Sequence, residues 1–237
     1  MTSGVLHLIP VPLGDIPPNG ALPLATLTAL RALNYFIVED ERSARRFLAA
    51  AAHPCAIRSL RIERFDKDSD ASRARQVLQP LNQGISAGLL SEAGCPAVAD
   101  PGALVVAAAH SAGLQVVPHV GPASMILALM ASGFNGQQFM FHGYLPPGRD
   151  QCRAAIAGLE QESRSRNTTQ IFIETRHRSD ALLALILETC EPVTRLCVAC
   201  DLTLPTQSVR SRHVRDWRRS PGAPLGRRPS VFVLYAR

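Results

Sequence analysis

Five short loops carry most of the side chains in this sequence that could bind or act on a ligand. They are rich in small residues, prolines and isolated carboxylates, and poor in catalytic nucleophiles. Each follows a strand-like apolar run or a proline turn. Loops of this kind can enclose a cofactor that itself carries the reactive group, since small residues let a ligand approach the backbone closely. The loops are residues 10–15, 91–96, 121–124, 174–178 and 201–203.

The stretch from residue 85 to residue 102 is the most informative of them. Residues 85–90 have the length and composition of a buried strand, and residues 91–96 form a small-residue loop with one carboxylate. A turn at Asp100, Pro101 and Gly102 then leads into a helix-like run. An ordinary strand-to-helix connection has the same composition, so this stretch alone leaves a binding loop and a plain connection equally open.

Several common kinds of site are excluded by the motifs that the sequence lacks. It has no G-x-G-x-x-G after the first strand and no Walker loop. The seven histidines show no H-x-x-x-H or H-E-x-x-H spacing, so we expect no metal site. Cys197 and Cys200 form a C-x-x-C inside a strand-like run, where they point to opposite faces. That placement argues against a redox pair and against a zinc site.

Length and composition indicate a globular protein. The 237 residues, 46% of them hydrophobic, suffice for one large domain or two of about 110–120 residues. No apolar run approaches the ~20 residues of a membrane span, and the first residues do not have the pattern of a signal peptide. We therefore expect a cytoplasmic protein that does not enter a membrane.

The net charge of +6 is carried almost entirely by arginine, because Lys67 is the only lysine. Codon bias in a GC-rich genome is one explanation. A nucleic-acid partner is the other, since guanidinium groups suit phosphate and base contacts. Both explanations stay open at this point.

Strand-like and helix-like segments alternate along the chain, which favours parallel sheets covered by helices on both faces. We expect an α/β fold of two α/β domains, residues 1–120 and 121–237, with mostly parallel sheets and a cofactor cleft between them. The second half repeats the pattern less regularly. The expected strands are residues 5–9, 35–38, 57–65, 85–90, 114–117, 139–144, 169–173, 196–202, 207–209 and 230–235.

The order of the motifs resembles a known family. LIPVPLGD at residues 8–15, VEDER at 38–42, LLSEAGCPAVADPG at 89–102, GPAS at 121–124 and GYLP at 143–146 are similar to successive blocks of the tetrapyrrole (corrin/porphyrin) methylase superfamily. The similarity is greatest to the branch of the ribosomal RNA small subunit methyltransferase I, and residues 171–175 and 199–205 resemble a shorter subgroup. The branch usually has Asp and Thr where this chain has Glu92 and Cys95. Pro10-Val11-Pro12 replaces the Gly-rich first loop of the tetrapyrrole enzymes.

The resemblance implies a homodimer that binds S-adenosyl-L-methionine between its domains, with a substrate trough in the first domain. The methyl group would pass by direct in-line displacement, so the protein mainly aligns donor and acceptor and excludes water. If the acceptor is a ribose hydroxyl, Asp100, Glu39 or Asp40 is a candidate base. The implied cofactor-binding residues are Pro10, Pro12, Leu13, Ser91, Glu92, Ala93, Gly94, Pro96, Ala123, Ser124, Glu174, Thr175, Asp201 and Leu202.

Three functions follow from the sequence. The first is methylation of RNA, at a ribose 2′-O of small-subunit ribosomal RNA. The second is methylation of a tetrapyrrole or another small metabolite. The third is a cofactor-binding, non-catalytic module associated with the ribosome. If the substrate is RNA, we expect an arginine-lined site, whereas a macrocyclic substrate would need a broad apolar trough.

Overall fold

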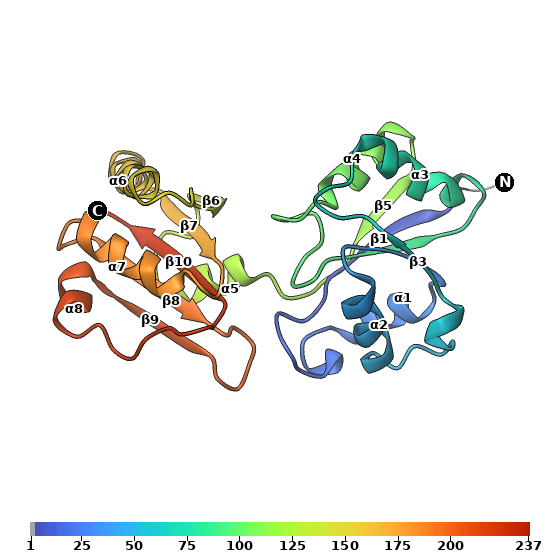
Figure 1. Ribbon diagram of the computed structural model, residues 1–237, viewed down its shortest axis with the longest axis horizontal. Coiled ribbons are helices and arrows are strands. Elements are labelled where there is room, and N and C mark those ends of the chain that lie inside the picture. The colour runs from blue at the N-terminus through green and yellow to red at the C-terminus, as the bar shows by residue number, and fades with distance from the viewer. Residues whose placement is uncertain (1–2) are drawn as a thin grey trace. The chain divides into compact units, whose positions relative to one another are not determined.

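The computed structural model describes residues 3–237, and the chain divides into two compact units, Met1–Ala123 and Ser124–Arg237. Each unit consists of a five-stranded sheet with helices packed on it (Figure 1). The predicted α/β class is confirmed.

The sheet of the first unit is entirely parallel, in the order β3-β2-β4-β1-β5. Because every strand runs in the same direction, the loops that follow the strands all emerge at one edge. In open sheets of this kind that edge is the usual place for ligands. The strands are β1 (Val5–Ile9), β2 (Tyr35–Val38), β3 (Arg61–Arg64), β4 (Ala87–Leu90) and β5 (Gln115–Pro118). The helices are α1 (Leu24–Arg31), α2 (Glu41–Ala50), α3 (Ala71–Asn82) and α4 (Ala103–Ser111), with short 3-10 turns η1 (Pro18–Gly20) and η2 (Ile57–Ser59).

Alternation along the strands gives this sheet two separate cores. In β2, Tyr35 and Ile37 pack toward α3 and α4, whereas Phe36 and Val38 pack toward α1 and α2 (Figure 1). Gly88 of β4 lies under the Phe36 ring, and a Cβ at residue 88 would come within 2.9 Å of that ring. A larger residue there would displace the layer formed by α1 and α2 from the strand ends.

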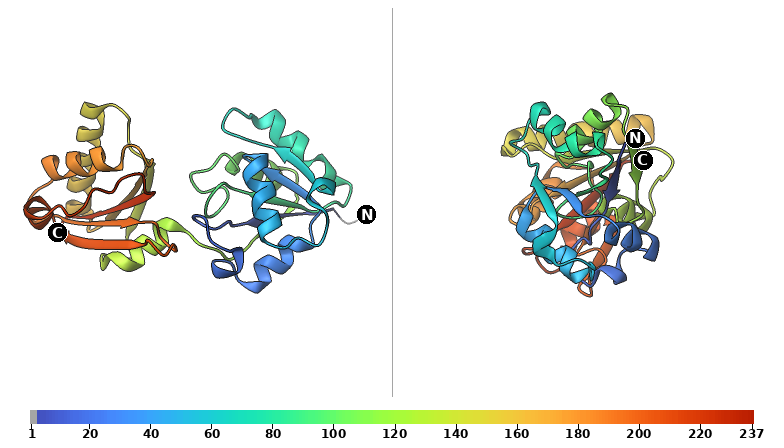
Figure 2. Two further views of the ribbon diagram at one scale, coloured as in Figure 1. Left: turned by 60° about the horizontal axis from the view of Figure 1, so that its bottom comes forward. Right: turned by 90° about the vertical axis from the view of Figure 1, so that its right-hand side faces the viewer.

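The second unit has the sheet order β6-β7-β10-β8-β9. Helices α6, α7 and α8 contribute to the core on one face of the sheet, and α5 packs on the other face (Figure 2). The strands are β6 (Phe139–Tyr144), β7 (Thr169–Glu174), β8 (Arg195–Cys200), β9 (Ser208–His213) and β10 (Ser230–Tyr235). The helices are α5 (Ser124–Ser132), α6 (Arg149–Arg166), α7 (Ser179–Thr189) and α8 (Val214–Arg219).

The second sheet departs from the expected parallel pairing. Only β6 and β7 are parallel, while β10 pairs antiparallel with both β7 and β8, and β8 pairs antiparallel with β9. The physical reason lies in the connections, because a parallel neighbour needs a long crossover. A loop without a helix joins β8 to β9, and the last strand inserts between β7 and β8.

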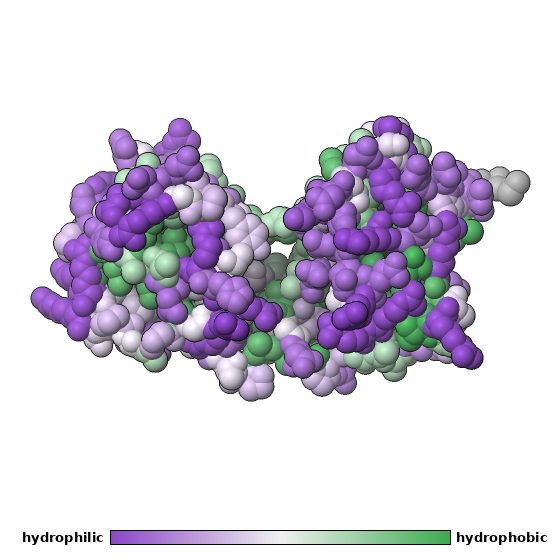
Figure 3. Space-filling model, viewed as in Figure 1, coloured by the Kyte–Doolittle hydropathy of each residue, from purple (hydrophilic) through white to green (hydrophobic). Residues whose placement is uncertain are grey.

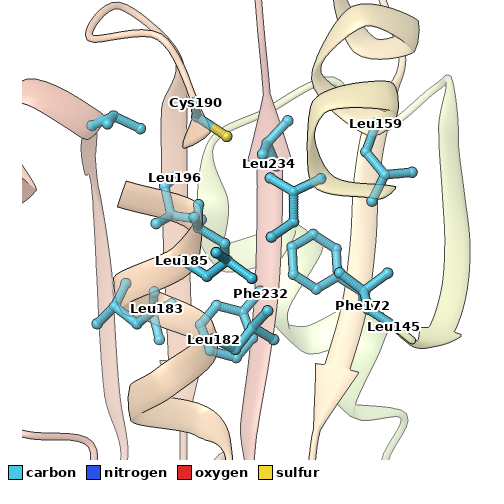
Figure 4. Packing of buried hydrophobic residues seen from close by; sticks show 14 of the residues in the cluster. Leu145, Leu159, Phe172, Leu182, Leu183, Leu185, Cys190, Leu196, Phe232 and Leu234 are labelled. Carbon is cyan, nitrogen blue, oxygen red and sulfur yellow. The ribbon is translucent and has the colours of Figure 1, made fainter. Parts of the chain in front are cut away.

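A large apolar cluster holds the helices of the second unit on its sheet (Figure 4). The Phe172 and Phe232 rings stack within it, with centroids 5.7 Å apart. Cys200 belongs to this cluster, whereas Cys197 is buried outside it, as alternation along β8 requires. Both thiols are free. Trp217 donates its indole N–H to the Leu196 carbonyl at 2.9 Å, which anchors α8.

Polar side chains cover most of the face of each unit that is in view in Figure 3. Within residues 3–237, every helix is too short or too polar to cross a bilayer.

Candidate functional site

Three loops are tied together at the carboxyl edge of the first sheet. Val11, after β1, and Gly94, after β4, exchange two backbone hydrogen bonds, of 2.9 and 3.1 Å. Ser91 donates its hydroxyl to the Gly94 carbonyl at 3.0 Å, and the Cys95 thiol lies 3.6 Å from the Pro122 carbonyl, after β5. Backbone hydrogen bonds therefore fix the first two loops relative to each other, and the Cys95 side chain contacts the third.

Two glycines allow these loops to approach so closely. Gly94 has φ of +76°, and a Cβ there would lie 3.2 Å from the Leu13 side chain and 3.4 Å from the Pro122 carbonyl. At Gly121 a Cβ would overlap the Pro10 ring, at 2.3 Å. Both glycines therefore allow the loops to pack closely against one another. The predicted residues in these loops are Pro10, Pro12, Leu13, Ser91, Glu92, Ala93, Gly94, Pro96 and Ala123, and Ser124 follows as the first residue of α5.

Asp100 organises the segment between this loop and α4. One carboxylate oxygen accepts hydrogen bonds from the backbone N–H groups of Ala97 at 3.0 Å and Gly102 at 2.8 Å. Both Ala97 and Ala99 have positive φ, at 66° and 52°, a conformation that costs an alanine about 1–2 kcal/mol. Burial raises the pKa of Asp100, although the two backbone hydrogen bonds act in the opposite direction. Asp100 thus holds a strained loop in place.

The two acidic residues that follow β2 have different surroundings. Asp40 is the N-cap of α2, and its carboxylate accepts a hydrogen bond from the Ser43 N–H at 2.8 Å. The hydrogen bonds with Ser43 lower the pKa of Asp40. Burial raises the pKa of Glu39, and the charges of Asp100 and Glu92 raise it further. Among the three candidate bases, Glu39 is the one whose carboxylate has no capping or loop-closing hydrogen bond among the described residues.

A cavity of about 430 Å³ opens next to these loops in the first unit. Residues 11–18 form one wall, α2 another, and the end of β4 with the start of its loop the third. Two side chains of α2, Arg46 and Phe47, give this cavity its character, and Phe47 was not predicted from the sequence. The chain order could have indicated a role for these residues. Helix α2 starts soon after β2 ends, so it begins at the carboxyl edge of the first sheet. The lining residues are Val11, Pro12, Gly14, Asp15, Ile16, Pro18, Ser43, Ala44, Arg46, Phe47, Ala50, Leu90, Ser91 and Glu92.

The remaining predicted residues lie in the second unit. Glu174 ends β7 with its side chain fully buried, and one of its oxygens accepts hydrogen bonds from the backbone N–H and the hydroxyl of Thr175, at 2.6 and 3.0 Å. Its other oxygen lies 3.1 Å from the Arg178 guanidinium but has no hydrogen bond among the described residues. Glu174 therefore keeps unused acceptor capacity in a buried position.

The loop after β8 is strained. Asp201 has φ of +51° and accepts a hydrogen bond from the Thr206 hydroxyl at 2.9 Å. Thr203 has φ of +74°, which is unfavourable for a β-branched residue, and its buried hydroxyl has no hydrogen-bond partner within residues 3–237. Leu202, between them, is buried.

The ends of β7 and β8 lie at the same edge of the second sheet. Ser230 of β10 is paired with Glu174 on one side and with Cys200 on the other. Four of the predicted residues of this unit thus occupy neighbouring strand ends and loops: Glu174, Thr175, Asp201 and Leu202. Among the described residues of this edge, the Thr203 hydroxyl has no hydrogen-bond partner and one Glu174 oxygen has only its ion pair with Arg178, so a ligand could donate a hydrogen bond to either.

Histidine, cysteine, aspartate and glutamate do not gather in threes around a possible metal position anywhere in residues 3–237.

The chain is similar in sequence to curated ribosomal RNA small subunit methyltransferase I proteins. It is 35% identical over 182 residues to the protein of Micromonospora olivasterospora, an alignment covering 77% of this chain and 54% of the relative. It is also 35% identical over 180 residues to the protein of Xylella fastidiosa, covering 75% of this chain and 60% of the relative. The chain thus spans between half and two thirds of the length of these relatives. No protein-family model matches it.

Solved structures of other proteins have the same fold as this chain. The chain superposes on the methyltransferase CobJ with a TM-score of 0.63 and 18% identity, over 99% of this chain and 100% of the other. The predicted resemblance to the ribosomal RNA small subunit methyltransferase I branch is confirmed by the sequence relatives, and these structures confirm the fold. A uroporphyrin-III-C-methyltransferase from Thermus thermophilus has the same fold, with a TM-score of 0.53 and 19% identity over 99% of this chain and 93% of the other.

Proposed function

We propose that the protein is an S-adenosyl-L-methionine-dependent methyltransferase. The observation that supports this most directly is the set of loops after β1, β4 and β5, held together through Val11 and Gly94 with glycine at each close approach. The sequence relatives are named as methyltransferases, and so are the fold neighbours.

The chain's own residues bind and align the reactants in this proposal. When bound, S-adenosyl-L-methionine supplies a methyl group on a positively charged sulfur, which needs no nucleophile from the protein. Backbone groups of residues 91–96 hold the polar parts of the cofactor, while Pro12 and Leu13 pack on its apolar parts. Ser124, Glu174, Thr175, Asp201 and Leu202 remain predicted cofactor contacts. Alignment and exclusion of water then provide most of the rate enhancement.

The proposed substrate is RNA, with a ribose 2′-hydroxyl of small-subunit ribosomal RNA as the methyl acceptor. The names of the sequence relatives support this choice. Exposed arginines support it too, because Arg42, Arg46, Arg58 and Arg75 form no salt bridge within the described residues. We further propose that Glu39 accepts the hydroxyl proton, since its raised pKa brings it closer to the working pH of a base.

Isolated small ribosomal subunits and methyl-labelled cofactor test this function. Transfer of label to the RNA supports the proposal, and nuclease digestion identifies the modified position. Glu39→Gln should lower the rate by about 10²- to 10⁴-fold without weakening cofactor binding. The matched control is Glu41→Gln, because Glu41 lies two residues away but is exposed and paired with Arg45. A labelled uroporphyrin-type macrocycle, with unlabelled RNA, would instead support the second substrate class.

We also propose that the protein forms a homodimer. The edge strand β6 exposes the apolar side chains of Phe139 and Met140, and Met130 of α5 is 74% exposed. Unprotected apolar edges of this kind are typical of protein interfaces. Light scattering at micromolar concentration should give twice the mass of the chain, and a monomer would contradict the proposal. The cytoplasmic location and the substrate trough in the first domain remain predictions.

A further inference from the structure

The cavity of the first unit shares Pro12, Ser91 and Glu92 with the loops tied together at the sheet edge, but it extends beyond them to α2. To the backbone and small residues of those loops it adds an aromatic ring, a guanidinium and two exposed carboxylates. These belong to Phe47, Arg46, Asp15 and Glu92. This mixture is typical of a site that takes one specific polar and partly aromatic group.

The volume limits what can enter. At about 430 Å³ the cavity lies near the lower end of the ~300–1,000 Å³ range of small-molecule sites. A group the size of one nucleotide fits this range, whereas a duplex does not. Single bases are commonly bound by stacking on an aromatic face, with a basic side chain on the phosphate.

The side chains that would hold a nucleotide are available for it. Phe47 is half-buried on α2, so one part of its ring is fixed by the core while another part faces the cavity. Arg46 is exposed, lines the same cavity and forms no ion pair within residues 3–237. Asp15 and Glu92 can accept hydrogen bonds from exocyclic amino groups of a base.

We propose that this cavity receives one unstacked nucleotide of the RNA substrate, with its base against Phe47 and its phosphate beside Arg46. This inference rests on the RNA substrate proposed above. It also places the acceptor ribose at the sheet edge that carries Glu39, because Glu39 lies between the end of β2 and the start of α2, and α2 lines the cavity. Enzymes that act on a base inside a duplex extract the nucleotide from the stack in the same way.

Nucleoside monophosphates test the cavity directly by calorimetry, with S-adenosylhomocysteine held at saturation throughout. The wild-type protein should bind a monophosphate more tightly than the corresponding nucleoside. Phe47→Ala should weaken both by roughly 5- to 150-fold, the usual contribution of one stacked base. Arg46→Ala should remove the preference for the phosphorylated form. Arg45→Ala is the matched control, because Arg45 is one residue away, pairs with Glu41 and does not line the cavity.

Three results would overturn the inference: no nucleotide binding by the wild-type protein, equal weakening by Arg45→Ala and Arg46→Ala, or competition between monophosphates and S-adenosylhomocysteine. The last would make the cavity part of the cofactor site. Binding of S-adenosylhomocysteine alone, measured first, separates the two proposals. If it fails, the proposed function fails; if it succeeds and nucleotides do not bind, only the present inference fails.

Discussion

Gly94→Ala should weaken cofactor binding, and a second glycine provides a close control for it. Gly94 and Gly113 both have left-handed backbone, with φ of +76° and +68°. A Cβ at Gly94 would lie 3.2 Å from the Leu13 side chain, whereas a Cβ at Gly113 would meet nothing within 4 Å. Alanine at either position should therefore cost about 1–2 kcal/mol of folding free energy from the backbone alone. Only at Gly94 should it also displace the loops after β1 and β5.

The expected magnitude for binding follows from linkage. At a hundredfold excess over its dissociation constant, a ligand stabilises the folded protein by about 2.7 kcal/mol. If Gly94→Ala weakens binding tenfold, the same ligand concentration stabilises the variant by only about 1.4 kcal/mol. Gly113→Ala should keep the full stabilisation, from a lower starting melting temperature.

Thermal unfolding of the three proteins, with and without S-adenosylhomocysteine, measures both quantities. Each kcal/mol corresponds to roughly 4 °C in melting temperature for units of this size. The reasoning is refuted if Gly94→Ala shows the same ligand-induced shift as the wild-type protein. It is also refuted if the shift of Gly113→Ala is reduced to the same extent, because backbone strain alone would then explain the effect.

Three further predictions concern single side chains. Asp40→Ala should lower the free energy of unfolding by about 1 kcal/mol, because it removes the side-chain cap that accepts the Ser43 N–H at the start of α2. It should leave the methyl-transfer rate constant unchanged in a labelled-cofactor assay. Glu39→Gln should raise the melting temperature at neutral pH, since a carboxyl whose pKa is raised by folding loses its stabilising contribution as pH rises through that pKa. The difference should vanish in acid, and a pH-independent difference would contradict this reasoning. Arg42→Ala should make the log–log salt dependence of RNA binding shallower, by roughly 0.7 for each phosphate that the variant no longer neutralises, as measured by filter binding.

The sequence alone determined the first unit well. Most of its strands are short apolar runs separated by helices, and crossover connections of this kind make the sheet parallel. The loops at its carboxyl edge were identified for the same reason, because the strand ends are visible in the sequence. Small residues at Gly94 and Gly121 indicated a close approach before any contact was known.

Tertiary structure decided what the local pattern left open. The place of β10 between β7 and β8 is a pairing across the whole second unit, so no local spacing could predict it. Asp40 and Glu39 are adjacent in sequence, yet one caps a helix while the other is partly buried among carboxylates. The cavity beside Phe47 exists only because α2 packs over the ends of β1 and β4. Secondary structure depends on neighbours in the chain, whereas the chemistry of a side chain depends on its neighbours in space.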